Sequence, residues 1–256
     1  MASLSEIREE YLRTPLKGRE AFLTRYREDK RTGVQSLLKK IEKDIAAEKK
    51  ETERTHGMYA YEREYASLGL LCGIDEVGRG PLAGPVCAGA VVLPPEKELL
   101  YLNDSKKLTE KKREELYDVI TKEALAYATA FVSPARIDEI NILQATYEAM
   151  TQAVQTLCNY LGQAPGALLI DAVRVPQLSQ YRQISIVKGD AKSASIAAAS
   201  IVAKVERDRL MEDYDRVYPG YGFASNKGYG AAEHIAALKR LGPLPIHRKT
   251  FIKSLL

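Results

Sequence analysis

Hydrophobic positions follow two different patterns along the chain. Before residue 69, apolar residues recur at helical spacing among densely charged positions. One such stripe consists of Val34, Leu37, Leu38, Ile41 and Ile45. From residue 69 on, short apolar runs bounded by Gly, Pro or polar residues alternate with longer amphipathic segments, which is typical of strands and helices. The pattern predicts a helical extension over residues 1–68 and an α/β domain with a mixed sheet over residues 69–256.

The positions of the elements follow from these runs and from their Gly and Pro boundaries. Strands are expected over residues 69–76, 85–93, 125–132, 167–171 and 183–187. Helices of the domain are expected over residues 109–123, 134–160 and 191–217. The extension is expected to hold three helices, with a capping box at Ser3 and Glu6 and breaks near residues 15–18 and 32–33.

Composition and charge narrow the class of protein. With 45% hydrophobic and 28% charged residues among 256, the chain is globular rather than disordered. Its net charge of +4 permits a nucleic-acid partner without requiring one. Three cysteines without CxxC spacing indicate a reducing compartment and no structural zinc. The first residues show no signal-peptide pattern and the apolar run 194–203 is too short to span a bilayer, so a cytoplasmic protein without membrane contact is expected.

Four acidic residues stand at equivalent places, each after an apolar run. They are Asp75, Glu76, Asp171 and Asp190. If the runs form neighbouring strands, the carboxylates converge at one edge of the sheet, where like charges repel unless divalent cations bind them. Hard oxygen ligands favour Mg²⁺ or Mn²⁺ over zinc, and two such ions about 3.5–4 Å apart can support phosphodiester hydrolysis. A lone acid at a strand end is more often a turn residue or a cap, as Asp190 is placed to be, but the shared placement of all four favours a metal site.

A glycine-rich loop follows the first two acids. Its residues 78–84 are Gly-Arg-Gly-Pro-Leu-Ala-Gly, and Asp104 lies about twenty residues further on, as in dinucleotide-binding proteins. The spacing is GxGxxxG rather than GxGxxG, and a β-branched run follows instead of a helix, which disfavours a nucleotide-binding oxidoreductase. The glycines instead allow bare backbone to approach a ligand, with Arg79 available for a phosphate. They also allow the strand to end or twist at Asp75 and Glu76, which neighbouring strand residues need if they are to share a site.

The residues around this loop closely match the motifs of a known family. Residues 73–86, GIDEVGRGPLAGPV, and residues 103–108, NDSKKL, resemble those of ribonuclease HII, the type 2 ribonuclease H of bacteria. Further matching segments, in the same order as in the family, are residues 170–171, 188–190, 193–208, 228–229 with His234, and 246–251. The resemblance covers residues 69–256 and leaves residues 1–68 as an extension.

The resemblance implies a fold and an activity. The fold is ribonuclease H-like, with a mixed five-stranded sheet flanked by helices and a helical C-terminal part. The activity is hydrolysis of RNA in RNA–DNA hybrids and incision 5′ to single ribonucleotides in duplex DNA, leaving 3′-hydroxyl and 5′-phosphate ends. The family's four catalytic, metal-binding acids match Asp75, Glu76, Asp171 and Asp190.

The resemblance also assigns the recognition of the ribose. Gly78, Arg79 and Gly80 match the family's loop, whose backbone contacts the 2′-hydroxyl, and Tyr229 matches the tyrosine that senses the RNA-to-DNA junction. This agrees with the chemistry, because the 2′-hydroxyl is both donor and acceptor and distinguishes RNA from DNA. A glycine loop can offer it backbone N–H and C=O groups.

Several other residues are candidates for substrate contact. Phosphate-binding cations are expected among Lys106, Lys107, Lys188, Lys192 and Lys204, and Ser105 lies in the same matching segment as the first two. His234 is a candidate proton shuttle or a structural, hydrogen-bonded histidine. His247 and Arg248 are expected to touch backbone phosphate.

The sequence therefore predicts a two-metal endoribonuclease that acts as a monomer on RNA–DNA hybrids and ribonucleotide-containing duplex DNA. A catalytically silent hybrid-binding protein is a second hypothesis, which is disfavoured because binding alone does not need the four acids. A junction resolvase or a type 1 ribonuclease H would not require the glycine loop together with Tyr229. The extension, in which acids nearly balance bases, stays open between a module that binds substrate or a partner and a solvated cap.

Overall fold

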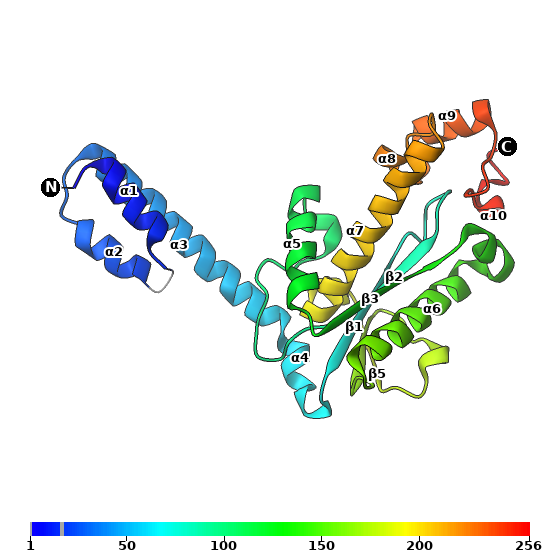
Figure 1. Cartoon of the computed structure of the whole chain (residues 1–256), viewed down its shortest axis with the longest axis horizontal. Helices are drawn as coiled ribbons and strands as arrows, with labels where there is room; N and C mark the ends of the chain where they lie inside the picture. The colour runs from blue at the N-terminus through cyan, green and yellow to red at the C-terminus, as the bar shows by residue number, and fades with distance from the viewer. Residues whose placement is uncertain (1, 16–17) are drawn as a thin grey trace. The chain divides into compact units, whose positions relative to one another are not determined.

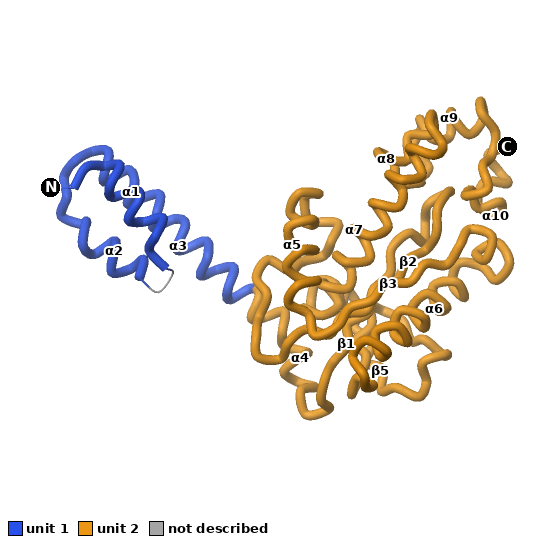
Figure 2. The backbone as a smooth tube through the Cα atoms, viewed as in Figure 1, with its two compact units in different colours: residues 1–54 blue, residues 55–256 orange. Residues whose placement is uncertain are grey.

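The computed structural model describes residues 2–15 and 18–256, and it divides the chain into two compact units, residues 1–54 and 55–256 (Figure 2). The boundary lies inside helix α3 (Thr32–Met58), upstream of the boundary expected at residue 68. The residues just after the boundary pack within the larger unit. The backbone N–H of Leu99 donates to the Tyr59 hydroxyl at 2.9 Å, for example, so this stretch of chain packs with the sheet-containing unit.

The first unit is helical, as predicted. It contains α1 (Leu4–Arg13), α2 (Arg19–Tyr26) and most of α3. The predicted capping box at Ser3 and Glu6 is present. Its buried core consists of Ile7, Phe22, Val34, Leu37, Leu38 and Ile41. The break expected at residues 32–33 coincides with the start of α3, whereas the break expected at 15–18 falls partly on residues 16 and 17, which lie outside the described residues.

The second unit is built on a mixed five-stranded sheet. Its strands are β1 (Leu71–Val77), β2 (Val86–Val92), β3 (Ala126–Val132), β4 (Ala167–Asp171) and β5 (Gln183–Ile186). Their order is β3-β2-β1-β4-β5, antiparallel from β3 to β1 and parallel from β1 to β5. Two strands that are far apart in sequence, β1 and β4, therefore lie side by side at the centre, with their carboxyl ends at the same edge.

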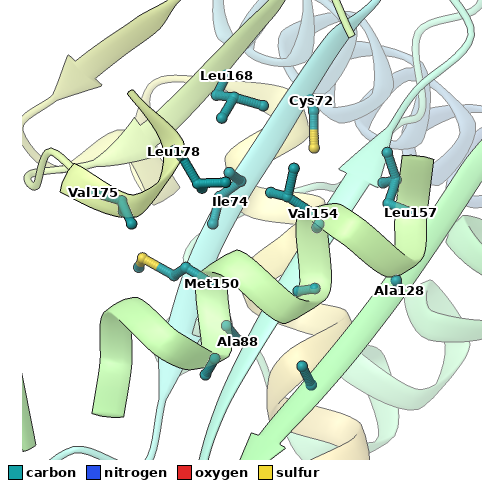
Figure 3. Packing of buried hydrophobic residues seen from close by; sticks show 14 of the residues in the cluster. Cys72, Ile74, Ala88, Ala128, Met150, Val154, Leu157, Leu168, Val175 and Leu178 are labelled. Atoms are coloured by element: carbon teal, nitrogen blue, oxygen red, sulfur yellow. The ribbon is translucent and has the colours of Figure 1, made fainter. Parts of the chain in front are cut away.

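Long helices cover both faces of this sheet (Figure 1). On one face lies α6 (Pro134–Leu161), where Met150 and Val154 pack with Ile74 of β1 (Figure 3). On the other face lie α5 (Glu110–Glu123) and α7 (Ala194–Val217). All three helices were predicted to within a few residues.

The Ala- and Ser-rich first half of α7 packs directly on the sheet. A Cβ atom added to Gly73 of β1 would lie 2.1 Å from the backbone carbon of Ser195, and one added to Gly89 of β2 would lie 2.4 Å from the carbonyl oxygen of Ala199. Helix and sheet backbones are therefore in contact, which only small residues allow. This close approach lets α7 run beside β1, from Ser195 at Gly73 to Arg207 at Gly78, so that its middle reaches the carboxyl edge of the strand.

Short helices complete the unit. They are α4 (Ala60–Glu64), α8 (Phe223–Asn226), α9 (Ala232–Leu241) and α10 (Lys249–Ile252), with 3₁₀ turns at Ala66–Leu68, Ser105–Lys107, Pro176–Leu178 and Gly189–Ala191. The C-terminal part is helical, as predicted. No helix in the described part of the chain has the length and apolar character to cross a membrane.

Candidate active site

The carboxyl edge of β1 and β4 gathers the first of the acidic residues. Ile74 of β1 is paired with Ile170 of β4 in parallel register, so the next residues along the two strands, Asp75 and Asp171, are neighbours. Since Ile74 packs against α6, alternation along the strand directs Asp75 to the opposite face, toward α7. Asp75 is only 6% exposed.

The Asp75 carboxyl lies in an environment that opposes its ionisation. Burial, followed by the charge of Glu76, raises its pKa well above the usual range, and the charge of Asp171 acts in the same direction. Hydrogen bonds from the Ser200 side chain and the Glu76 backbone act against this rise. A buried carboxyl surrounded by like charges gains stability from a nearby cation.

Glu76 continues β1, which neither ends nor breaks between the two acids, because the strand runs to Val77. Its carboxylate forms an ion pair with Arg79, whose Nη1 lies 3.3 Å from Glu76 Oε1. Burial raises the pKa of Glu76, and the charge and hydrogen bond of Arg79 partly offset this effect. The charge of Asp171 raises it further, so Glu76 and Asp75 face the same neighbouring charge although they alternate along the strand.

Asp190 is tied to the same edge through Asp171. The backbone N–H of Gly189 donates to Asp171 Oδ1 at 2.6 Å and fixes the 3₁₀ turn that carries Asp190. Burial, then the charges of Asp104 and Asp171, raise the pKa of Asp190. Helix α7 is capped by Ser193 instead, so Asp190 is not the helix cap that its position in the sequence suggested.

The donor set suits hard divalent cations. The site offers carboxylate oxygens, which match Mg²⁺ and Mn²⁺ better than zinc. Among residues 2–15 and 18–256, no three Asp, Glu, His or Cys side chains are already arranged as a metal-binding group.

The glycine loop has the conformation that its sequence requires. Gly78 has a φ of +86°, and a Cβ atom there would lie 2.1 Å from Nε of Arg207. Gly80 faces Tyr229, whose Cε1 would be 3.8 Å from an added Cβ. Tyr229 is 44% exposed. The structure thus places the two predicted ribose-recognition elements, residues 78–80 and Tyr229, beside each other, and Arg79 links them to Glu76.

The candidate phosphate ligands divide into two groups. Lys106 is exposed, and its charge acts on both Glu76 and Asp190, while Lys192 is exposed in the turn after Asp190. Lys204 is largely buried and its Nζ pairs with Asp208 at 2.6 Å; burial lowers its pKa. Lys106 and Lys192 are therefore exposed near the acids, whereas Lys204 is engaged within the protein.

The remaining candidates lie around these groups. Lys107 Nζ lies 3.9 Å from Asp104, and Lys188 is exposed in the turn before Asp190. Ser105 is buried, and its hydroxyl lies 2.9 Å from that of Ser200, which in turn supports Asp75. Ser105 thus contacts the site from behind.

Two expected phosphate contacts are wrong. His247 and Arg248 are 2% and 0% exposed, and both are hydrogen-bonded inside the protein, so neither side chain reaches a phosphate. His234 is also buried and hydrogen-bonded, in agreement with a structural histidine. Sequence reasoning also missed the position of Asp104 beside Asp190. Its place in the NDSKKL segment was the available signal.

Comparisons with known proteins agree with the fold and the motifs. The family model described as Ribonuclease HII matches residues 72–254, and that of the Ribonuclease HII N-terminal domain matches residues 3–66. The chain is 58% identical to ribonuclease HII of Lachnoclostridium phytofermentans over 90% of this chain and 89% of the relative. It is 50% identical to ribonuclease HII of Bacillus subtilis over 91% and 89%, respectively.

Solved structures give the same result. The crystal structure of ribonuclease H2 from Pyrococcus horikoshii is similar with a TM-score of 0.59 and 27% identity, over 73% of this chain and 96% of that chain. The match of the family model covers most of the chain, including the acids, the glycine loop and Tyr229. The chain belongs to the ribonuclease HII family of endoribonucleases H, which act on RNA–DNA hybrids.

Proposed function

We propose that this protein hydrolyses the RNA strand of RNA–DNA hybrids and also incises duplex DNA on the 5′ side of a single ribonucleotide. One observation carries the proposal: the carboxylates at the carboxyl edge of β1 and β4 are joined through the Arg79–Glu76 ion pair to a glycine loop that lies beside Tyr229. The group that would react with the phosphate and the groups that would recognise the ribose thus form one surface.

Recognition of a single ribose is assigned to the loop and the tyrosine. Gly80 is exposed and has no side chain to cover its backbone, so its N–H and C=O groups can bond the 2′-hydroxyl, which both donates and accepts, while the buried Gly78 sets the turn that presents it. The exposed Tyr229 ring can stack on the next deoxyribose, where a ribose would add a hydroxyl. Discrimination then rests on one 2′-hydroxyl rather than on base sequence.

Hydrolysis is assigned to the four acids. Asp75, Glu76, Asp171 and Asp190 would hold two Mg²⁺ or Mn²⁺ ions. When bound, such ions lower the pKa of a water molecule and neutralise charge on the leaving oxygen. Water adds to phosphorus and the bond to the 3′-oxygen breaks, which leaves a 3′-hydroxyl on the DNA and a 5′-phosphate on the ribonucleotide. Lys106 and Lys192 would orient the phosphate.

The test is a cleavage assay on duplex DNA with one ribonucleotide, next to an all-DNA duplex of the same sequence. Wild type and Asp75→Asn are compared in Mg²⁺, in Mn²⁺ and in EDTA. We expect incision 5′ to the ribonucleotide by wild type with a divalent ion, no incision in EDTA, and a loss of at least 10²-fold in Asp75→Asn. The all-DNA duplex should stay intact.

Two other outcomes would contradict the proposal. Tight binding of the ribonucleotide duplex without incision in either metal would indicate a silent hybrid-binding protein. Cleavage of a long RNA–DNA hybrid without incision at a single ribonucleotide would keep the ribonuclease activity but remove the role assigned to the loop and Tyr229.

A further inference from the structure

The C-terminal segment of the chain packs against the glycine loop. Residues 246–248 run antiparallel to residues 82–84 of the glycine loop: the N–H of Gly84 donates to the carbonyl of Ile246, and the N–H of Arg248 donates to the carbonyl of Leu82, both at 2.9 Å. An isolated bridge joins Ala83 to His247. The C-terminal segment thus pairs with the loop far from it in sequence.

The Arg248 side chain continues this contact toward the reactive end of the loop. Its Nη2 donates to the carbonyls of Gly78 (2.5 Å) and Gly84 (2.8 Å), its Nη1 to that of Arg79 (2.8 Å), and its Nε to that of Gly84 (3.0 Å). All four of these hydrogen bonds go to backbone carbonyls, and burial lowers the pKa of this guanidinium. A buried cation whose hydrogen bonds go to carbonyls holds their positions firmly, because moving them away would leave its N–H donors unpaired.

Arg207 of α7 binds further backbone carbonyls at the C-terminal end of the loop. Its Nε donates to the carbonyl of Pro85 at 2.9 Å, and its Nη2 to that of Ala83 at 3.3 Å. Its Nη1 donates to the carbonyl of Lys227 at 3.0 Å, two residues before Tyr229. Two buried guanidinium groups therefore bind carbonyls on both sides of the loop.

A chain of hydrogen bonds connects the same C-terminal segment to Tyr229. The N–H of Leu244 donates to Nδ1 of His247 at 2.9 Å, so the proton of a neutral His247 is on Nε2. That proton faces Nε2 of His234 at 3.1 Å, which must accept it, so His234 carries its own proton on Nδ1. His234 Nδ1 then donates to the carbonyl of Tyr229 at 2.7 Å. Every donor meets an acceptor in one direction along the chain.

We propose that Arg248 and the His247–His234 pair are positioning residues that fix the glycine loop and Tyr229 relative to each other and thereby set the discrimination between ribose and deoxyribose. This inference rests on the proposed function, because it takes the loop and Tyr229 as the ribose-recognition elements. Neither Arg248 nor the two histidines touch the substrate. They act through the carbonyls of Gly78, Arg79 and Tyr229.

The first test uses Arg248→Lys, which keeps the charge and removes the planar fork, so that fewer carbonyls are bound. The measurement is binding in EDTA, by fluorescence anisotropy, to duplex DNA with one ribonucleotide and to the same duplex without it. The readout is the discrimination ratio, which is the dissociation constant for the all-DNA duplex divided by that for the ribonucleotide duplex. We expect the ratio to fall about tenfold toward one, through weaker binding of the ribonucleotide duplex. Arg136→Lys, an exposed ion-paired arginine of α6, is the matched control and should keep the wild-type ratio.

The second test separates the two hydrogen bonds of His234. Asparagine places an amide N–H near the position of Nδ1, so His234→Asn can keep the bond to the Tyr229 carbonyl while it loses His247. Glutamine places its amide near Nε2, so His234→Gln keeps contact with His247 and loses the carbonyl of Tyr229. We expect a lower discrimination ratio in His234→Gln and partial rescue in His234→Asn. A simple folding defect would lower the melting temperature of both without this order.

The outcomes separate this inference from the function on which it rests. A wild-type ratio near one, without incision at a ribonucleotide, would remove the proposed function itself. A wild-type preference for the ribonucleotide duplex that survives unchanged in Arg248→Lys and in His234→Gln would overturn the inference alone. If Arg248→Lys does not fold, the order of the two His234 variants still decides.

Discussion

At the scale of single residues, Asp75 combines a requirement of chemistry with a cost to folding. Its pKa is raised in the folded state, so the stability linked to its protonated form is present below the unfolded pKa and is lost as pH rises through the folded value. At neutral pH the ionised carboxylate therefore opposes folding unless a cation binds it. Stability and activity make opposite demands at this position.

We therefore predict that Asp75→Asn melts at a higher temperature than wild type in EDTA at neutral pH, although it does not cleave. Each kcal/mol gained should raise the melting temperature by about 2–4 °C. The amide oxygen can still accept the backbone N–H of Glu76, so this hydrogen bond is kept. Thermal unfolding with and without Mg²⁺ measures the effect: the ion should stabilise wild type and have little effect on the variant.

Asp118→Asn, at an exposed position of α5, provides the matched control. It should change neither the melting temperature in EDTA nor the response to Mg²⁺. A lower melting temperature for Asp75→Asn, together with a normal response to the ion, would show that the carboxylate serves structure rather than metal binding.

The sequence predicted some residues of the site better than others. Asp75 and Asp171 were found because each follows an apolar run, and strands that carry such runs end at one edge. Arg248 was assigned to phosphate, but it lies buried against Gly78, 170 residues earlier in the chain. Nothing local marks a cation whose partners are distant backbone carbonyls, because composition and periodicity report only on neighbours.

At the scale of elements, periodicity located the strands and long helices but not their arrangement. The start of α7 was expected at residue 191 and is at Ala194, because the 3₁₀ turn at Gly189–Ala191 comes first and Ser193 supplies the cap. The placement of β1 between β2 and β4 brings together strands that are far apart in sequence, and a local pattern does not show this pairing. Long-range pairing is the part of the fold that the sequence alone left open.

One helix leads to a prediction about binding. In α3, Lys39, Lys40, Lys43 and Lys50 are exposed and, at 100° per residue, lie on one side of the helix. None of the four forms an ion pair in the described part of the chain. Glu48 of α3, by contrast, is paired with Arg19. Such a row of free cations suits the phosphate backbone of a duplex.

We predict that replacing Lys40, Lys43 and Lys50 by Gln weakens binding of ribonucleotide duplex and all-DNA duplex alike. The slope of log affinity against log salt concentration should become less steep by about one unit for each lost phosphate contact. Two single variants serve as a matched pair. Lys43→Gln removes a charge from the row and should lessen the slope, whereas Lys49→Gln removes one from the side opposite Lys40 and should leave the slope nearly unchanged. Equal salt slopes for the triple variant and wild type would assign the extension to another role.

At the scale of the whole molecule, the division into two units raises the question of which N-terminal residues the sheet-containing unit requires in order to fold. Residues 1–54 hold a core of their own, and the unit from residue 55 on includes α4 (Figure 2). Within that unit, Glu62 accepts hydrogen bonds from the Ser193 hydroxyl (2.6 Å) and from the backbone N–H of Ser195 (2.9 Å). A carboxylate at this place stabilises the start of α7, the helix that packs beside Asp75.

We predict that a chain that begins at residue 55 keeps its fold and its incision activity, whereas one that begins at residue 69 is much less stable. The shorter chain loses Glu62 at the α7 N-terminus, worth about 1 kcal/mol, and the buried Met58 and Tyr59, worth about 1.5–3 kcal/mol each. The melting temperature should therefore fall by on the order of 10 °C between the two chains. Thermal unfolding followed by circular dichroism, with incision measured on the same samples, checks this. Equal melting temperatures would place the structural boundary at residue 68, and loss of folding in the longer chain would show that the sheet-containing unit depends on residues 1–54.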